Sequence, residues 1–168
     1  MSEGNEKLTE LEWHRKIAAK LFNQTWDLMD KEERNQEEND EMIHSSHASR
    51  YHWGVVVASG KYPKTGPINL ERGDWQVSRV YCLTENAESA KYHAQRCLKI
   101  CQENNIGDFD IAFAYEGMAR AFSVSGNESD EVKKYLDLAN EAGTKIKKKE
   151  DKDWFISQLK TVPGYSET

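Results

Sequence analysis

The fold is decided by two stretches of sequence, VSRVYCLTENAESAKYHAQRCL at residues 77–98 and MARAFSVSGNESDEVKKYLDLA at residues 118–139. Tyr81 and Phe122 lie 41 residues apart, and Arg79 and Arg120 are separated by the same number of residues. In each stretch an aromatic residue follows a small one by three positions, and small or apolar residues recur at helical spacing after a break. The sequence therefore contains one helical hairpin written twice.

The shared positions resemble the tetratricopeptide repeat, whose first helix carries a small residue and an aromatic and whose second helix carries spaced small residues. The matching positions are Ser78, Tyr81, Ala90, Ala94, Cys97 and Leu98, and then Ala119, Phe122, Gly126, Val132 and Ala139. The resemblance covers residues 68–145 and implies a stack of hairpins whose concave face binds peptides. Its period is longer than the usual ~34 residues of that family.

Four features depart from the family pattern. Trp75 lies one place from the expected first-helix Trp, Glu85 replaces the turn Gly, Val132 is displaced by one residue, and neither copy ends in Pro. A second resemblance is carried by HASRYHWG at residues 47–54 and NLERGDW at residues 69–75. These stretches are similar to a group of uncharacterised bacterial proteins, and the similarity implies no activity.

The remaining sequence extends the helical pattern in both directions. Apolar residues recur at three and four from Leu8 to Asp30, and Thr9 with Glu12 predicts a capping box there. We predict one domain over residues 1–168, an all-α, right-handed stack of three antiparallel hairpins with a C-terminal capping helix. The hairpins are expected at 8–58, 68–104 and 108–148, and the capping helix at 151–160. Their helices are expected at 8–30, 36–58, 70–84, 87–104, 109–125, 129–148 and 151–159.

Composition and charge exclude several classes of function. The net charge of −6 argues against a nucleic-acid partner, which requires a basic face. No apolar stretch reaches the ~18 residues of a membrane span, and no apolar leader opens the sequence, so we expect a cytoplasmic protein that does not bind membranes. The sequence contains no nucleophile elbow and no phosphate-binding glycine loop, which favours a protein that is not an enzyme.

A second interpretation rests on carboxylates and imidazoles of the helix expected at 36–58. Asp40, His44 and His47 lie on one stripe of that helix, with Glu37 before them. With a further ligand from His14 or His93, this stripe predicts a site for one divalent metal such as zinc, in a metal-dependent enzyme or a metal-binding protein. A solvated polar stripe is the alternative, in which case no cofactor is expected.

Two of the three cysteines form another candidate pair. Cys97 and Cys101 are one helical turn apart, which would suit a redox or metal pair. The favoured interpretation is that both are small buried apolar residues.

The main functional prediction concerns the concave face that the repeat resemblance implies. Carried over by position, this face presents Arg72, Trp75, Arg79, Phe113, Glu116 and Arg120. Three arginines beside aromatic surface predict a scaffold that binds a protein or peptide with acidic or carboxylate-bearing groups. In the alternative interpretation, Trp75 packs against the helix at 36–58 and the arginines pair with Glu71, Asp74 and Glu116.

Overall fold

The computed structural model describes residues 8–166, and within this range all regular secondary structure is helical. The all-α prediction is therefore confirmed. The helices are α1 (Glu10–Met29), α2 (Gln36–Ala58), α3 (Gly66–Leu83), α4 (Ala87–Glu103), α5 (Asp108–Ser125), α6 (Ser129–Thr144) and α7 (Lys149–Leu159).

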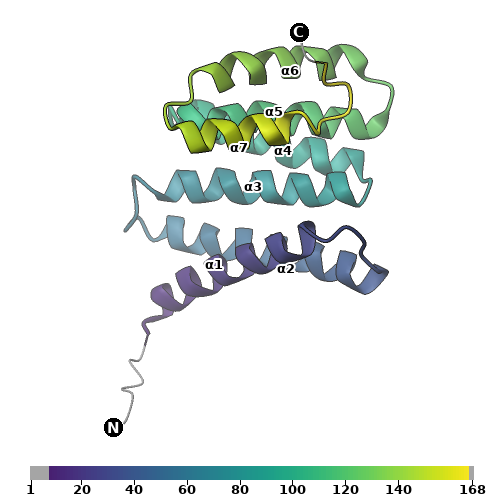
Figure 1. Ribbon diagram of the computed structural model, residues 1–168. Coiled ribbons are helices and arrows are strands. Elements are labelled where there is room, and N and C mark those ends of the chain that lie inside the picture. The colour runs from purple at the N-terminus through teal and green to yellow at the C-terminus, as the bar shows by residue number, and fades with distance from the viewer. Residues whose placement is uncertain (1–7, 167–168) are drawn as a thin grey trace.

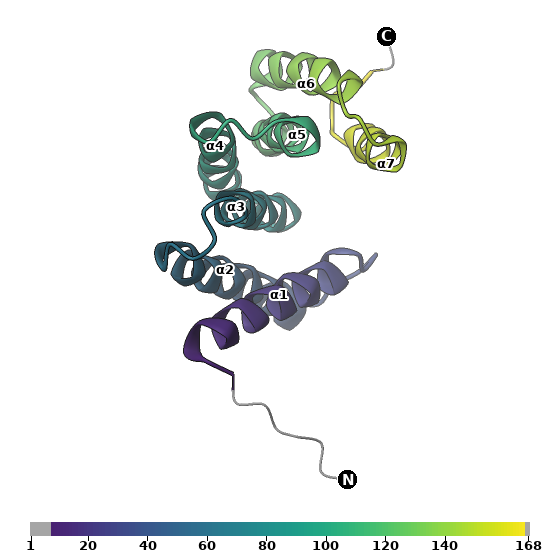
Figure 2. The ribbon, with the colours of Figure 1, turned by 90° about the vertical axis from the view of Figure 1, so that its left-hand side faces the viewer.

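The helices pack in pairs that follow one another along the chain (Figure 1). α1 packs on α2, α3 on α4 and α5 on α6, and each pair contacts the next through α2 with α3 and α4 with α5. Turned by 90°, the molecule is an arc whose two ends, α1 and α7, face the same side (Figure 2). The first helices of the pairs, α1, α3 and α5, therefore lie together on the inner side, and α7 joins them there.

Local signals set most helix boundaries. Thr9 and Glu12 form the predicted capping box at the start of α1, and Asn35 forms another with Glu38 at the start of α2. α5 ends at Gly126, which has the left-handed conformation (φ 72°) that glycine adopts without strain. The position that lacks the family's turn Gly, Glu85, has a positive φ of 58°.

α3 and α6 depart most from the predicted bounds. α3 begins at Gly66 and not at residue 70, because Pro67 lies in its first turn, where the fixed φ of proline suits a helix. α6 ends at Thr144 and not at Lys148, and the chain then turns so that Ile146 is buried. The resulting turn leads directly into α7, whose start at Lys149 is two residues earlier than expected.

The two copies of the repeat use their aromatic residues in the same way. Tyr81 stacks on His93 of α4 with ring centroids 6.0 Å apart, and Phe122 stacks on Tyr135 of α6 at 5.6 Å. Each ring thus contacts the second helix of its own pair and is half-buried. The small residues Ala90 and Ala94 are buried, which allows α3 and α4 to approach closely.

α7 covers the open end of the last pair. Phe155, Leu159 and the following Val162 are buried in the main core. The ring of Phe155 lies 5.1 Å from that of Phe113 on α5. α7 contacts both α5 and α6, so it belongs to the core of the protein and also forms one wall of its inner side.

Candidate binding site on the concave face

The predicted arginines lie on the inner side, but a buried carboxylate already binds them. Glu116 of α5 has no exposed surface, and its Oε1 accepts hydrogen bonds from Arg79 Nη1 at 3.0 Å and Arg120 Nε at 2.7 Å. Its Oε2 accepts from Trp75 Nε1 at 3.4 Å. Burial is the main cause of a lowered pKa of Arg79. Glu116 therefore joins equivalent positions of the two copies from within the protein.

The C-terminal segment covers the same arginines from the other side. Arg79 Nη2 donates to Gln158 Oε1 at 3.2 Å, and Arg120 Nη2 donates to Thr161 Oγ1 at 2.7 Å and to the carbonyl of Gln158 at 3.0 Å. Arg120 is 9% exposed, so little of it is accessible to a partner. The alternative interpretation was thus correct in pairing arginines with Glu116.

The contacts of Trp75 and Arg72 differ from those named in that alternative. The ring of Trp75 packs against those of Trp26 of α1 and Phe113 of α5, with ring centroids 5.6 Å away in both cases. Arg72 forms a two-point ion pair with Asp110, with Nε to Oδ1 at 2.7 Å and Nη2 to Oδ2 at 3.2 Å. Of the three predicted arginines, Arg72 is the one with a largely exposed side chain, at 48%.

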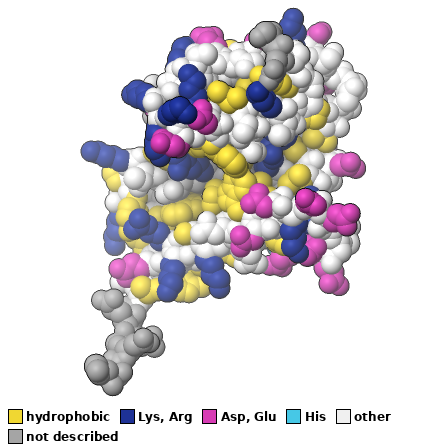
Figure 3. Space-filling view, in the orientation of Figure 1, with side chains coloured by type: hydrophobic (Ala, Val, Ile, Leu, Met, Phe, Trp, Pro, Cys, Tyr) yellow, Lys and Arg dark blue, Asp and Glu magenta, His cyan; other side chains and the backbone are white. Residues whose placement is uncertain are grey.

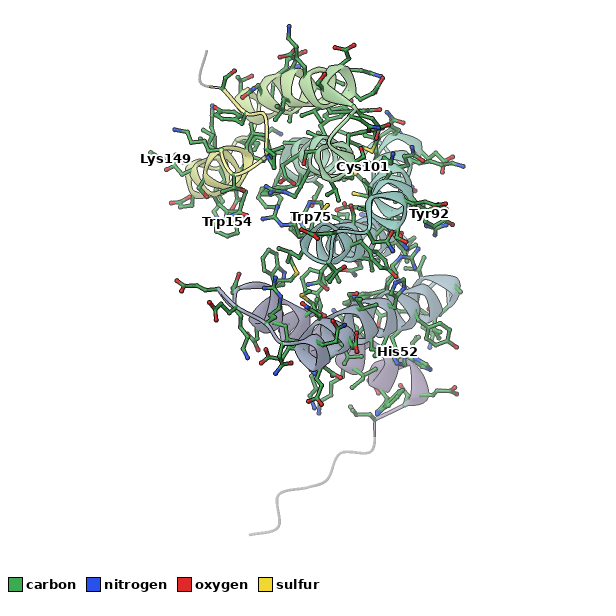
Figure 4. All side chains as sticks on the ribbon, turned by 90° about the vertical axis from the view of Figure 1, so that its right-hand side faces the viewer. His52, Trp75, Tyr92, Cys101, Lys149 and Trp154 are labelled. Atoms are coloured by element: carbon green, nitrogen blue, oxygen red, sulfur yellow. The ribbon has the colours of Figure 1, made fainter. Side chains whose placement is uncertain are left out.

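An apolar cavity of about 200 Å³ opens on this inner side. Four helices contribute to its walls: α1, α3, α5 and α7. The lining residues are Phe22, Trp26, Glu71, Arg72, Trp75, Phe109, Asp110, Phe113 and Trp154. Hydrophobic side chains gather in a hollow across the middle of this face (Figure 3), and Trp75 and Trp154 lie on the same side of the stack (Figure 4).

A carboxyl group lies in the wall of this aromatic cavity. Glu71 is 2% exposed, and its Oε2 accepts a weak hydrogen bond from Cys97 Sγ at 3.3 Å. Among residues 8–166, no N–H or O–H donor forms a hydrogen bond with Oε1; Arg72 Nε lies 3.7 Å away, which is too long for one. Burial raises the pKa of Glu71 to about 10, together with repulsion from Cys101 and Asp110 and a hydrogen bond that the protonated acid makes with Asp110. Glu71 is therefore protonated at neutral pH.

The predicted metal ligands are not brought together. Asp40 is exposed and accepts from Gln36 Nε2 at 2.8 Å, and His44 is also exposed. His47 turns inward, where its Nε2 lies 2.9 Å from the hydroxyl of Tyr81. α1 packs on this end of α2 through Met29 and Met42, but Asp40 and His44 stay exposed and have no second helix of residues 8–166 beside them that offers a ligand.

The two histidines proposed as extra ligands also have other neighbours. His14 Nδ1 lies 2.7 Å from Nδ1 of His52, and His93 Nδ1 lies 2.8 Å from the buried carboxylate of Asp74. Arg50 and Arg96 donate to the same Asp74. Sequence reasoning named Asp74 only as a partner for concave arginines; its actual partners come from α2 and α4.

One group of metal-ligating residue types does meet within residues 8–166, and it lies beside the cavity. The ligand atoms of Glu71, Cys97 and Cys101 lie within 4.8 Å of one another, and all three residues are buried. A hydrogen bond with Cys101 is the main cause of a raised pKa of Cys97, and burial and the contact with Glu71 raise this pKa further. We interpret the group as a neutral hydrogen-bonded cluster, in which the cysteines are small buried residues as the sequence favoured.

Sequence reasoning predicted three of the cavity-lining residues on the concave face: Arg72, Trp75 and Phe113. It missed Glu71 as a cavity group. The available signal was the spacing of Glu71 and Trp75 by four residues, which puts a carboxyl on the apolar stripe of one helix.

Comparisons of the chain with protein-family models, with curated proteins and with solved structures found no match. Within residues 8–166, every helix is too short or too polar to cross a membrane.

Proposed function

We propose that this chain is a tetratricopeptide-repeat-like scaffold that binds a protein partner at the aromatic cavity of its concave face. The proposed architecture is a right-handed stack of three hairpins with α7 as the capping helix. It is supported by the equivalent stacking of Tyr81 and Phe122 and by the bridging of Arg79 and Arg120 through Glu116.

The observation that carries the proposal is the open aromatic cavity itself. Its walls come from four helices that are distant in sequence, and the side chains of residues 8–166 leave it open. Aromatic surface in a concave site supplies large contact area and is typical of the anchoring points of protein interfaces. Trp154 lines this cavity and is exposed, so packing in the hydrophobic core does not explain a tryptophan at this position.

We place the contact with the partner at the cavity and not at Arg79 and Arg120. These arginines already bind Glu116 and the C-terminal segment, so a partner would have to break buried ion pairs to use them. Arg72, at the cavity, stays accessible to a partner.

Two aspartate substitutions on opposite sides of the molecule test the site. Trp154 is 46% exposed at the cavity and Tyr92 is 55% exposed on the other side of the stack (Figure 4). Partners would be captured from the source cell with the wild-type protein, purified, and titrated by calorimetry. We expect Trp154→Asp to weaken binding at least ~10-fold, about 1.4 kcal/mol, and Tyr92→Asp to leave it unchanged. A partner that tolerates Trp154→Asp but is lost with Tyr92→Asp would show that the function lies on the other face.

A further inference from the structure

Glu71 is a buried acid that the fold does not need. The protonated acid can donate its own O–H to Asp110, but the ionised carboxylate needs a donor at Oε1, and none of residues 8–166 supplies one. The adjacent Cys97 supplies only a weak S–H donor. An apolar residue of similar size would fill the same wall without this cost. The position therefore suits a ligand that brings its own donors.

The charges around the cavity define what that ligand must carry. Arg72 and Asp110 are the other two charged residues of the cavity wall, and they pair with each other. This cation and this carboxylate balance. An ionised Glu71 adds one negative charge, which one monovalent cation would neutralise.

We propose that the cavity binds the primary ammonium group of a lysine side chain of the partner, with Glu71 and Asp110 as its acceptors. This inference rests on the proposed function, because it names the group with which the partner enters the site. The predicted acidic partner is thereby replaced at this position by a basic one.

The aromatic walls suit the remainder of such a side chain. A cavity of about 150 Å³ accommodates benzene, so about 200 Å³ has room for the slender butyl stem of lysine. Cations are attracted to the faces of Trp and Phe rings, and five such residues besides Trp154 line the site. An ammonium group offers three donors, enough for Oε1 of Glu71 and an oxygen of Asp110.

Binding would release a proton from Glu71. The titratable and charged neighbours of its carboxyl are Arg72 on α3, Cys97 and Cys101 on α4, and Asp110 on α5. α1 contributes the apolar Phe22 and Trp26 to the cavity, and α7 contributes Trp154. Asp151 of α7 acts on Arg72. An ammonium ion stabilises the ionised carboxylate, so the proton leaves as the cation enters. Affinity should therefore rise with pH, by up to tenfold per unit, below the pKa of about 10 in the free protein.

Two capped tripeptides test the charge requirement. Acetyl-Gly-Lys-Gly-amide and its norleucine analogue have side chains of nearly the same shape, and only the first carries a charge. Binding to the full-length protein would be followed by tryptophan fluorescence and by calorimetry in two buffers of different ionisation enthalpy. We expect the lysine peptide to bind at least ~10-fold more tightly, with release of a proton, and Glu71→Gln to abolish both the difference and the proton release. Equal affinity for the two peptides, or binding that Glu71→Gln leaves unchanged, would overturn the inference.

Additional experiments distinguish the possible ligands and show which of the two proposals fails. If n-butylammonium binds as tightly as the lysine peptide, the ligand is a small amine and not a partner side chain. If Zn²⁺ binds tightly, is lost with Cys97→Ala and blocks the lysine peptide, the site is a metal site. If a partner depends on Trp154 but neither tripeptide binds, the scaffold proposal stands and the lysine inference fails. If the lysine peptide binds but no partner depends on Trp154, the scaffold proposal fails.

Discussion

Glu116 shows how one buried carboxylate can hold a helical stack together. It is completely buried and receives guanidinium groups from two helices, Arg79 from α3 and Arg120 from its own α5. Removing its charge would leave two cations without their counter-ion in a poorly hydrated region. Breaking a buried ion pair from one side generally costs about 3–5 kcal/mol.

The first prediction compares two glutamates that each pair with a residue four positions later. Glu116→Gln should lower the free energy of unfolding by ~3 kcal/mol or more, whereas Glu141→Gln should leave it nearly unchanged. The control pair, Glu141 with Lys145, is about two-thirds exposed on both sides. Urea denaturation followed by circular dichroism measures both. Similar effects for the two variants would contradict a structural role of the Glu116 cluster.

Glu71 gives a second prediction, on the pH dependence of stability. Its pKa is about 10 in the folded protein and near 4.3 in an unfolded chain, so between these values the folded state holds an additional proton. Stability must therefore fall as pH rises through this window, by up to ~1.4 kcal/mol per unit. Glu71→Gln removes the titration.

We expect the Glu71→Gln variant to be more stable than the wild type at pH 7 and the gap to widen toward pH 9. Denaturation midpoints at pH 5, 7 and 9 measure the difference. If the two stability profiles run parallel, Glu71 is already ionised in the folded state.

At the scale of elements, two glycines inside helices differ in the space around them, so alanine substitutions there compare helix propensity with side-chain packing. A Cβ at Gly143 of α6 would lie 2.4 Å from Cε1 of Phe155, which is fully buried and cannot move aside freely. A Cβ at Gly54 of α2 would meet only Arg50 Nη1, at 3.5 Å, an ordinary contact. Gly143 is thus required for the approach of α7, and Gly54 is not.

The third prediction follows from this contrast. Gly54→Ala should stabilise the protein by about 0.5–1 kcal/mol, because alanine restricts the unfolded chain and favours helix. Gly143→Ala should destabilise it by about 1–3 kcal/mol despite the same gain in propensity, since the added volume has no room. Thermal unfolding distinguishes the signs. Stabilisation by both substitutions would mean that α7 shifts at little cost.

At the scale of the whole molecule, α7 decides whether the last pair of helices has a closed core. Phe155 has no exposed surface, while its neighbour Ile156 is 36% exposed. Phe155→Ala should therefore cost about 3–5 kcal/mol, and Ile156→Ala less than ~1 kcal/mol. Guanidinium unfolding gives both values. If Phe155→Ala lowers the free energy of unfolding no more than Ile156→Ala does, α7 does not belong to the cooperative core.

Local patterns predicted the helices well and the site only in part. The bounds of α2 match the prediction because Asn35 and the helical pattern after it mark the start. The start of α3 was four residues late, because Gly66 and Pro67 were interpreted as a linker when proline in fact opens the helix. The stripe of Asp40, His44 and His47 was correctly spaced, yet spacing on one helix does not indicate which part of it a second helix covers.

By itself, the sequence determined the all-helical class, the repeated pattern and the aromatic residues of the concave face. These depend on propensity, capping and periodicity, which act over about four residues. Only the tertiary structure decided which charges meet, because the partners of Arg79 and Arg120 at Glu116, Gln158 and Thr161 come mostly from 37 to 79 residues away. The arginines were predicted to be free for a partner, but the return of α7 to the inner side buries them. The same packing leaves Oε1 of Glu71, in an aromatic cavity, without a hydrogen-bond donor from residues 8–166.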